Sequence, residues 1–263
     1  MSSTRYALAV EELAYALGVL GGTDTAIGFL LAILGERPRM ETEGRLLAAS
    51  HALVARGLLD FDMDSGETWL KGGLEKVIGP MITHNYSLRC SKATEAEEEV
   101  ITFYAGDSRF IKHYLHHGVV SVIEEVTEQD AVKQDLSEFF EIPTNDVVGE
   151  PIVVVPKTTI DSIRQGPLSQ SESEAQQALI QCGAAESDAA AIIQDLKHSA
   201  YRGSIVKLKL EDEQTVSDKG FLLLKGETRG WILVINVDGE TTMLSVYPAS
   251  TAAFQQQLAL LMT

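Results

Sequence analysis

The chain has 263 residues, of which 45% are hydrophobic, and its 21 Lys and Arg residues against 38 Asp and Glu residues give a formal net charge of −17. This length suits two domains or one large pseudo-symmetric domain, and the hydrophobic content excludes wholesale disorder. The strong negative charge disfavours a nucleic-acid-binding protein and a protein that docks on anionic membranes.

The first 80 residues are predicted to be mainly helical, because apolar residues recur there at helical spacing. Helices are expected over residues 8–20, 23–34, 45–56 and 65–78. Residues 37–43 and 58–64 are expected to be loops, the second of them acidic.

The apolar stretch from Leu13 to Leu34 raises the question of a membrane span. Gly21 and Gly22 interrupt it, and no uninterrupted run of 18 apolar residues exists. The glutamates at positions 11 and 12 disrupt the apolar region that a signal peptide would need. We therefore expect a cytoplasmic protein that does not insert into a membrane.

From Ile82 the pattern changes to an alternation of apolar and polar residues, which is typical of strands in an antiparallel sheet. The expected elements are strands over 82–90, 100–105, 109–116 and 119–126, followed by a helix over 127–141. The same order follows later, with helices over 173–182 and 187–201, strands over 204–210, 220–225, 230–236 and 241–247, and a last helix after Pro248 with Ser250 as its cap.

The two sets of strands align without a gap. Residues 86–116 lie over residues 206–236, so that Gly106 falls on Gly226 and Arg109 falls on Arg229. The alternation, the turns and the flanking elements repeat together. We therefore predict an α/β (α+β) fold that is internally duplicated, with a quasi-two-fold antiparallel sheet flanked by helices.

This repeat divides the chain into three segments. Residues 1–142 are predicted to form the first helix-and-sheet half and residues 173–263 the second. Residues 143–172 are a Pro- and Ser-rich connection, within which the apolar run 152–155 predicts one strand. The part near residues 166–173 is expected to be mobile.

Two groups of side chains could hold a metal ion. Asp60, Asp62 and Asp64 alternate like the first ligands of a calcium loop, but Lys71 stands where such a loop has Glu, so a solvated turn is favoured. His113, His116 and His117 could serve a metal-dependent enzyme, which is one alternative function. His113 and His116 would point to opposite faces of a strand, and no known catalytic motif occurs, so we expect no enzyme activity, no cofactor and no metal site.

A second alternative is a transcription-linked, winged-helix-like module made of the helix over 45–56 and the acidic segment after it. A DNA reader needs cations on its recognition face. Here Arg45, Arg56 and Lys71 are outnumbered by Asp and Glu residues. The pattern favours a structural role for this region.

The strands of the second half are apolar on both sides, so they are either covered by helices or form a binding surface. An acidic run between two strands of the first half could steer a partner protein. The candidate partner-binding residues are Phe221, Leu222, Leu224, Trp231, Ile232, Val234, Glu97 and Glu98.

The order of elements resembles the EspG family, the cytosolic chaperones of ESX (type VII) secretion systems. The resemblance extends over nearly the whole chain. It lies in the segments YALAVEELAYALGVLG, LAASHALVARGLLD, FFEIPTNDVVGEPIVVVPKTTIDSI and KGETRGWILVINVDGETTMLSVYPASTAAFQQQLALL. The family has a quasi-two-fold α/β fold, which agrees with the repeat.

The resemblance implies a non-enzymatic chaperone or adaptor. Its partner would be a protein with an exposed apolar helical tip, such as a secreted PE–PPE pair. The chain is unusually acidic for this role, and the resemblance supplies no catalytic residues.

Overall fold

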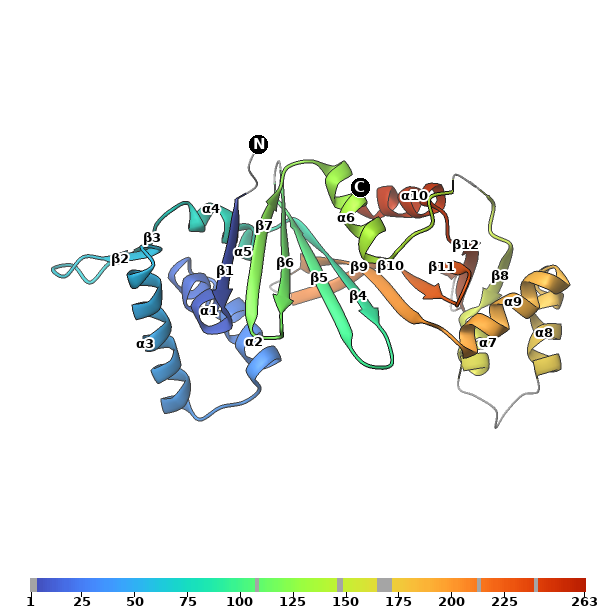
Figure 1. The fold of residues 1–263 in the computed structure, drawn as a ribbon, viewed down its shortest axis with the longest axis horizontal. Coiled ribbons are helices and arrows are strands. Elements are labelled where there is room, and N and C mark those ends of the chain that lie inside the picture. The colour runs from blue at the N-terminus through green and yellow to red at the C-terminus, as the bar shows by residue number, and fades with distance from the viewer. Residues whose placement is uncertain (1–3, 107–108, 146–148, 165–171, 212–213, 239–240) are drawn as a thin grey trace. The chain divides into compact units, whose positions relative to one another are not determined.

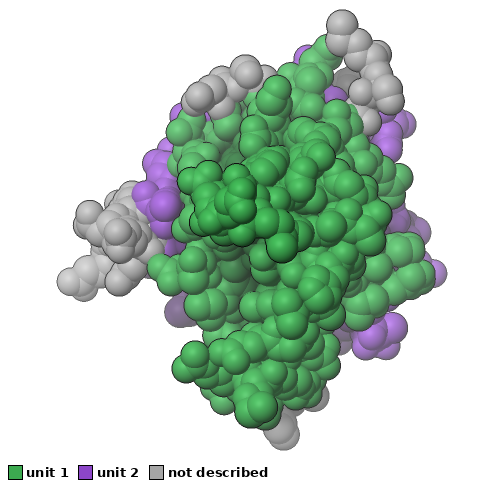
Figure 2. Space-filling model, turned by 90° about the vertical axis from the view of Figure 1, so that its left-hand side faces the viewer, with its two compact units in different colours: residues 1–88, 101–129 green, residues 89–100, 130–263 purple. Residues whose placement is uncertain are grey.

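The computed structural model describes residues 4–106, 109–145, 149–164, 172–211, 214–238 and 241–263. These residues form two compact units, one made of Met1–Leu88 and Ile101–Gln129 and the other of Arg89–Val100 and Asp130–Thr263 (Figure 2). Positions 166–171 of the segment predicted to be mobile lie outside the described residues. The end of the first duplicated half, predicted at residue 142, is a different kind of boundary from the limits of these units and stays a prediction.

Figure 1 shows the helices and strands along the chain. The helices are α1 (Val10–Val19), α2 (Thr23–Leu34), α3 (Arg39–Ala55), α4 (Leu74–Ile78), α5 (Pro80–Thr83), α6 (Gln129–Phe139), α7 (Lys157–Arg164), α8 (Glu172–Gln181), α9 (Glu186–Lys197) and α10 (Thr251–Met262). The strands are β1 (Arg5–Ala9), β2 (Leu59–Phe61), β3 (Thr68–Leu70), β4 (Tyr86–Ala93), β5 (Glu98–Ala105), β6 (Phe110–His116), β7 (Val120–Val126), β8 (Val153–Pro156), β9 (Tyr201–Glu211), β10 (Gln214–Lys225), β11 (Gly230–Asp238) and β12 (Thr241–Pro248).

Within the described residues, ten strands form a sheet in the order β1-β7-β6-β5-β4-β9-β10-β11-β12-β8, and β2 pairs with β3 in a separate hairpin. The strand pairings that the structure describes are antiparallel. The expected α+β fold with an antiparallel sheet flanked by helices is confirmed. Four strands followed by a helix occur twice along the chain, as the repeat predicts, whereas a common origin of the two sets stays a prediction.

In the first unit, α1 packs against strands of the sheet. Leu13 and Leu17 of α1 share a buried cluster with Leu8 of β1, Ile111 of β6 and Ile123 of β7. The helix also contacts α2 and α3. Helix α1 contributes more buried residues than α2 or α3, which lie nearer the surface of this unit, although Phe29 of α2 still reaches His113 of β6.

In the second unit, strands β10 and β11 are covered on both faces. Trp231 belongs to a buried cluster with Leu179 of α8 and Ile192 of α9. On the other face, the ring of Phe221 lies 5.9 Å from the ring of Phe254 in α10. This explains why β10 and β11 are apolar on both sides.

Several predicted boundaries in the first unit are wrong. The helix expected over 65–78 is confirmed only at its end, as α4 (Leu74–Ile78), because Thr68–Leu70 forms β3. Gly66, Gly72 and Gly73 have φ of 73°, 66° and 79°, which is left-handed backbone that does not continue a helix. These three glycines therefore favour the turns of a hairpin over a continuous helix.

Helix α7 (Lys157–Arg164) was not predicted, since residues 143–172 were expected to contain a single strand, and other errors lie at element ends. The first helix starts at Val10 because Arg5–Ala9 pairs with β7 instead. The helix predicted from residue 45 begins earlier, at Arg39, directly after Pro38. The strand predicted from Ile82 begins at Tyr86, because Pro80–Thr83 is helical.

The cap predicted for the last helix is confirmed and allows a stability test. Ser250 precedes α10, and its side-chain oxygen accepts a hydrogen bond from the backbone N–H of Ala253 at 3.1 Å. Ser250→Ala is expected to lower the free energy of unfolding by about 1 kcal/mol, measured by urea denaturation, because that N–H loses its partner. Ser173→Ala, at an exposed position of α8, is the control and should change stability by less than about 0.5 kcal/mol. Equal midpoints for the two variants would contradict the capping role.

Candidate protein-binding groove between α2 and α3

Helix α2 is apolar but largely uncovered. After its first turn it carries only apolar residues and glycine, yet Ala26 is its sole buried residue. The side chains of Ile27 and Leu31 are 50% and 49% exposed. A helix that is apolar on all sides is normally buried, so its exposure marks a surface suited to binding another molecule.

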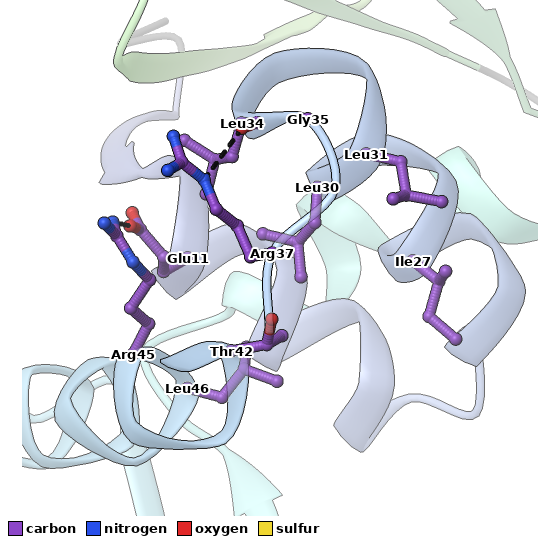
Figure 3. Close-up of a pocket in the computed structure, with 10 residues that line it drawn as sticks. All are labelled: Glu11, Ile27, Leu30, Leu31, Leu34, Gly35, Arg37, Thr42, Arg45 and Leu46. Carbon is purple, nitrogen blue, oxygen red and sulfur yellow. Dashed lines mark hydrogen bonds and ion pairs between the residues drawn. The ribbon is translucent and has the colours of Figure 1, made fainter. Parts of the chain in front are cut away.

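A groove runs between α2 and α3 in the first unit. One cavity of about 190 Å³ is open there, and a second of about 370 Å³ adjoins it along α2. The two share Ile27, Leu30 and Leu46 in their linings. Figure 3 shows the residues that line the first cavity, which are Glu11, Ile27, Leu30, Leu31, Leu34, Gly35, Arg37, Thr42, Arg45 and Leu46. We call these two adjoining cavities the α2–α3 groove.

Ion pairs hold α3 beside α1 and so fix one wall of the groove. Nη1 of Arg45 lies 2.9 Å from a carboxylate oxygen of Glu11, and its Nη2 lies 3.0 Å from Glu41. These two carboxylates, Glu11 first, raise the pKa of Arg45. Directly after α3, Nη1 of Arg56 lies 2.7 Å from the buried carboxylate of Glu12.

The first unit, to which the groove belongs, exposes many large apolar side chains. Among the described residues, fourteen large hydrophobic side chains are exposed, and eight of them lie between residues 27 and 69. They are Ile27, Leu31, Met40, Leu47, Val54, Phe61, Met63 and Trp69. This stretch of 43 residues thus holds over half of them, so the apolar surface is concentrated in the first unit rather than scattered.

The partner-binding residues predicted in the second half lie mostly in the core. Phe221, Leu224, Trp231 and Ile232 are buried. The indole Nε1 of Trp231 donates a hydrogen bond to buried Asp195 at 2.8 Å. In the described conformation these four side chains pack the sheet against its helices, and a partner would reach them only if that packing opened.

The other predicted residues keep access to solvent. Leu222 and Val234 are half-buried, and Glu97 and Glu98 are exposed at the turn between β4 and β5. The backbone N–H of Glu97 and that of Ala96 are bonded to the side chain of Thr94, which shapes this turn. Contact of this set with a partner stays a prediction.

The histidine cluster does not come together as a ligand set. His113 is buried, and burial lowers its pKa to about 4. Its ring lies 5.4 Å from the ring of Phe29 in α2, whereas the ring of the exposed His116 lies 3.9 Å from the ring of His117 and is tilted against it. Among the residues that the structure describes, no three His, Cys, Asp or Glu side chains are placed to hold a metal ion.

The acidic segment forms the β2–β3 hairpin, and the carboxylates of Asp60 and Asp62 have protein partners. Asp60 lies 3.0 Å from Nζ of Lys71, and Asp62 accepts the backbone N–H of Asp64 at 2.7 Å. The lysine lowers the pKa of Asp60, and the backbone N–H groups of Asp64 and Ser65 lower that of Asp62. A hairpin after a helix is the order expected of a winged helix, but Arg45 and Arg56 are paired with glutamates as described above and do not offer a cationic recognition face.

The groove residues Ile27, Leu31 and Leu46 were not predicted as candidates. A signal was present in the sequence. A helix of twelve residues that lacks polar residues after Thr25 has no solvated face, so in an outer layer it must expose apolar side chains. Only the tertiary packing decides that α2 stays at the surface, with Phe29 against His113 of β6 and with Ile27 and Leu31 about half exposed.

Comparison with known proteins identifies the family. A family model described as "Uncharacterised protein YfjC" matches residues 8–257. The chain belongs to the YfjC family. No curated protein matches this YfjC family member.

A solved structure with the same fold as this YfjC family member is that of EspG5. It is the type VII secretion system chaperone of Mycobacterium tuberculosis, in complex with a PE25–PPE41 dimer. The two share a TM-score of 0.67 at 12% sequence identity, over 98% of this chain and 96% of the EspG5 chain. The EspG-like fold expected from the sequence is therefore confirmed, and at this identity the likeness concerns the fold alone.

The question of a membrane span is also answered for the described part of this family member. None of its helices combines the length and apolar character that crossing a bilayer requires.

Proposed function

We propose that this protein is a non-enzymatic chaperone or adaptor that binds a partner protein in the α2–α3 groove. The observation that carries the proposal is the apolar helix α2, with Ile27 and Leu31 about half exposed. The shared fold with EspG5, which was solved bound to a PE25–PPE41 dimer, supports the same class of function. The partner would be a helical protein with an exposed apolar end, comparable with a PE–PPE pair.

The groove can supply the affinity for such a partner. Covering an exposed Leu or Ile side chain contributes about 1.5–3 kcal/mol when burial is complete, and proportionately less from a half-exposed start. Ordering of the two surfaces opposes this gain, so a few well-covered anchors decide the affinity. The net charge of −17 keeps the free protein apart from other copies of itself despite this apolar surface.

Leu31→Asp is expected to reduce partner binding at least tenfold, because an uncompensated charge would be buried in the complex. The measurement is quantitative co-purification from native lysate with the tagged full chain, followed by mass spectrometry and affinity measurement on the captured protein. Leu260→Asp on α10 is the matched control, since Leu260 is also an exposed helical leucine, with 56% exposure. The control variant should retain the partner.

The same experiment tests the binding site predicted in the second half. Val234→Asp and Glu97→Lys alter half-buried and exposed members of that set. If these variants lose the partner while Leu31→Asp retains it, the groove is not the site and the second half takes its place. If none of these variants changes what co-purifies, the chaperone proposal is wrong.

A further inference from the structure

The α2–α3 groove is apolar along its length but carries an arginine with open donors at one end. Nε of Arg37 donates a hydrogen bond to the backbone carbonyl of Leu34 at 3.1 Å, at the C-terminal end of α2 (Figure 3). No carboxylate lies within ion-pair distance of this guanidinium among the described residues. Its Nη1 and Nη2 groups are therefore exposed at the end of the groove and available to the side chain of a partner.

The three other arginines between residues 23 and 56 differ from Arg37 in this respect. Arg39 pairs with Glu43 at 2.7 Å, and Arg45 and Arg56 pair with glutamates of α1 and α3 as described above. A guanidinium can bind a carboxylate through two parallel hydrogen bonds. An acidic side chain of a partner would give Arg37 the pairing that its neighbours have within the chain.

Local charge does not oppose an acidic partner here. Residues 23–56 contain four acidic residues, Asp24, Glu36, Glu41 and Glu43, and four arginines, so this segment is neutral. The net charge of −17 is therefore carried entirely by the rest of the chain. The charged residues that line the groove itself are Glu11, Arg37 and Arg45, one acidic and two basic, so the lining does not repel an acidic group.

The walls of the groove favour a helical occupant over an extended one. Both walls are helices, whose backbone groups are bonded within each helix except at the ends, so they offer no row of partners to an extended strand. An extended peptide would bring unpaired N–H and C=O groups against apolar side chains. A helix satisfies its own backbone and presents a row of side chains at i, i+4 and i+7, the spacing of Ile27, Leu31 and Leu34 in α2.

We propose that the occupant of the α2–α3 groove is an amphipathic helix of another protein, whose apolar stripe lies along α2 and whose Asp or Glu side chain pairs with Arg37. This inference rests on the proposed function and adds the chemistry of the partner to it. The guanidinium of Arg37 favours a partner that brings a carboxylate to this end of the groove.

The test is a selection from a displayed library of helical hairpins. One helix of each hairpin carries randomised positions along one face and at both ends, and the hairpin scaffold keeps it folded without the protein. The library is selected on the full-length chain after depletion on Leu31→Asp. We expect an enriched apolar stripe with Asp or Glu at one end, and selection on Arg37→Glu is expected to enrich Lys or Arg at that same position. For an acidic binder, Arg37→Gln should lower the affinity about two- to fivefold, the range of an exposed ion pair, and Arg39→Gln should not.

The outcomes separate this inference from the proposed function. An enriched apolar stripe without an acidic preference would overturn the pairing with Arg37 and leave the groove as the binding site. No enrichment over Leu31→Asp would overturn both. A dimer in light scattering that Ile27→Asp converts to a monomer would show that a second copy of the chain is the occupant, which would also overturn the inference.

Discussion

Gly226→Ala is expected to lower the free energy of unfolding by about 3 kcal/mol. A Cβ atom at position 226 would lie 2.1 Å from Oδ1 of Asp195 and 2.3 Å from its Cγ, far inside contact distance. Asp195 is buried and accepts hydrogen bonds from Nε1 of Trp231 at 2.8 Å and from Nε of Arg229 at 3.3 Å. The carboxylate cannot move away without weakening these bonds, so the added methyl group strains the site or leaves the buried indole N–H unpaired.

Urea denaturation of the full chain measures this effect, with two further variants for comparison. Gly44→Ala on α3 meets no atom within 4 Å and should stabilise the protein by about 0.5–1 kcal/mol, because alanine is the better helix former. Asp195→Ala removes the obstructing carboxylate, so adding Gly226→Ala to it should cost much less than Gly226→Ala does alone. Additive losses in the double variant would contradict the contact between Gly226 and Asp195.

The turn beside Asp195 can be compared with the turn that aligns with it in the first half of the sequence repeat. Gly226 and Arg229 are the residues that align with Gly106 and Arg109. In each turn the glycine N–H donates to the carbonyl of the arginine three residues later, at 2.9 Å in both. The arginines differ in their partners, since Arg109 pairs with Glu125 at 2.7 Å and Arg229 reaches Asp195. The aligned glycines thus serve the same turn in different surroundings.

His113 is expected to make the protein less stable below neutral pH. Burial lowers the pKa of His113 from 6.5 to about 4 in the folded protein. The unfolded chain therefore takes up a proton in this interval that the folded protein does not, and stability falls as the pH drops from 6.5 toward 4. The loss is about 1.4 kcal/mol per pH unit, about 3 kcal/mol in total, and it levels off below the folded pKa.

The measurement is the slope of unfolding free energy against pH between 4.5 and 6.5, compared between variants. His113→Leu should reduce this slope by the contribution of about one proton. His116→Gln is the control, since His116 is exposed, and it should keep the slope of the unchanged protein. Equal slopes for the unchanged protein and His113→Leu would show that His113 titrates normally in the folded state.

A large part of the fold follows from local sequence patterns. The strands β5, β6 and β7 were predicted within two residues of their bounds, because alternation and turn residues are properties of the local chain. Helix α2 was predicted over the residues that form it, because Gly22 and Gly35 flank an apolar run. The β2–β3 hairpin was missed because Trp69 and Leu70 also fit a helical spacing.

The candidate site was predicted less well than the fold. The sequence correctly predicted that β11 is apolar on both faces, with Trp231 on one face and Ile232 on the other. It left open whether helices or a partner cover these faces. The structure covers Trp231 with α8 and α9 and buries Ile232 completely, and it places the exposed apolar surface on α2 instead. Burial depends on which elements pack together, and that is not a property of a single segment.

The sequence by itself determined the type and order of most elements and the acidic character, because these rest on composition or on periodicity over a few residues. The resemblance to the EspG family rests on four longer segments and implied the fold. The tertiary structure alone decided that α1 occupies the buried layer, that α2 is left uncovered, and that Arg37 keeps open donors while Arg39, Arg45 and Arg56 are paired. The physical reason is that exposure and ion pairing are set by contacts between residues far apart in the chain, such as Arg56 with Glu12.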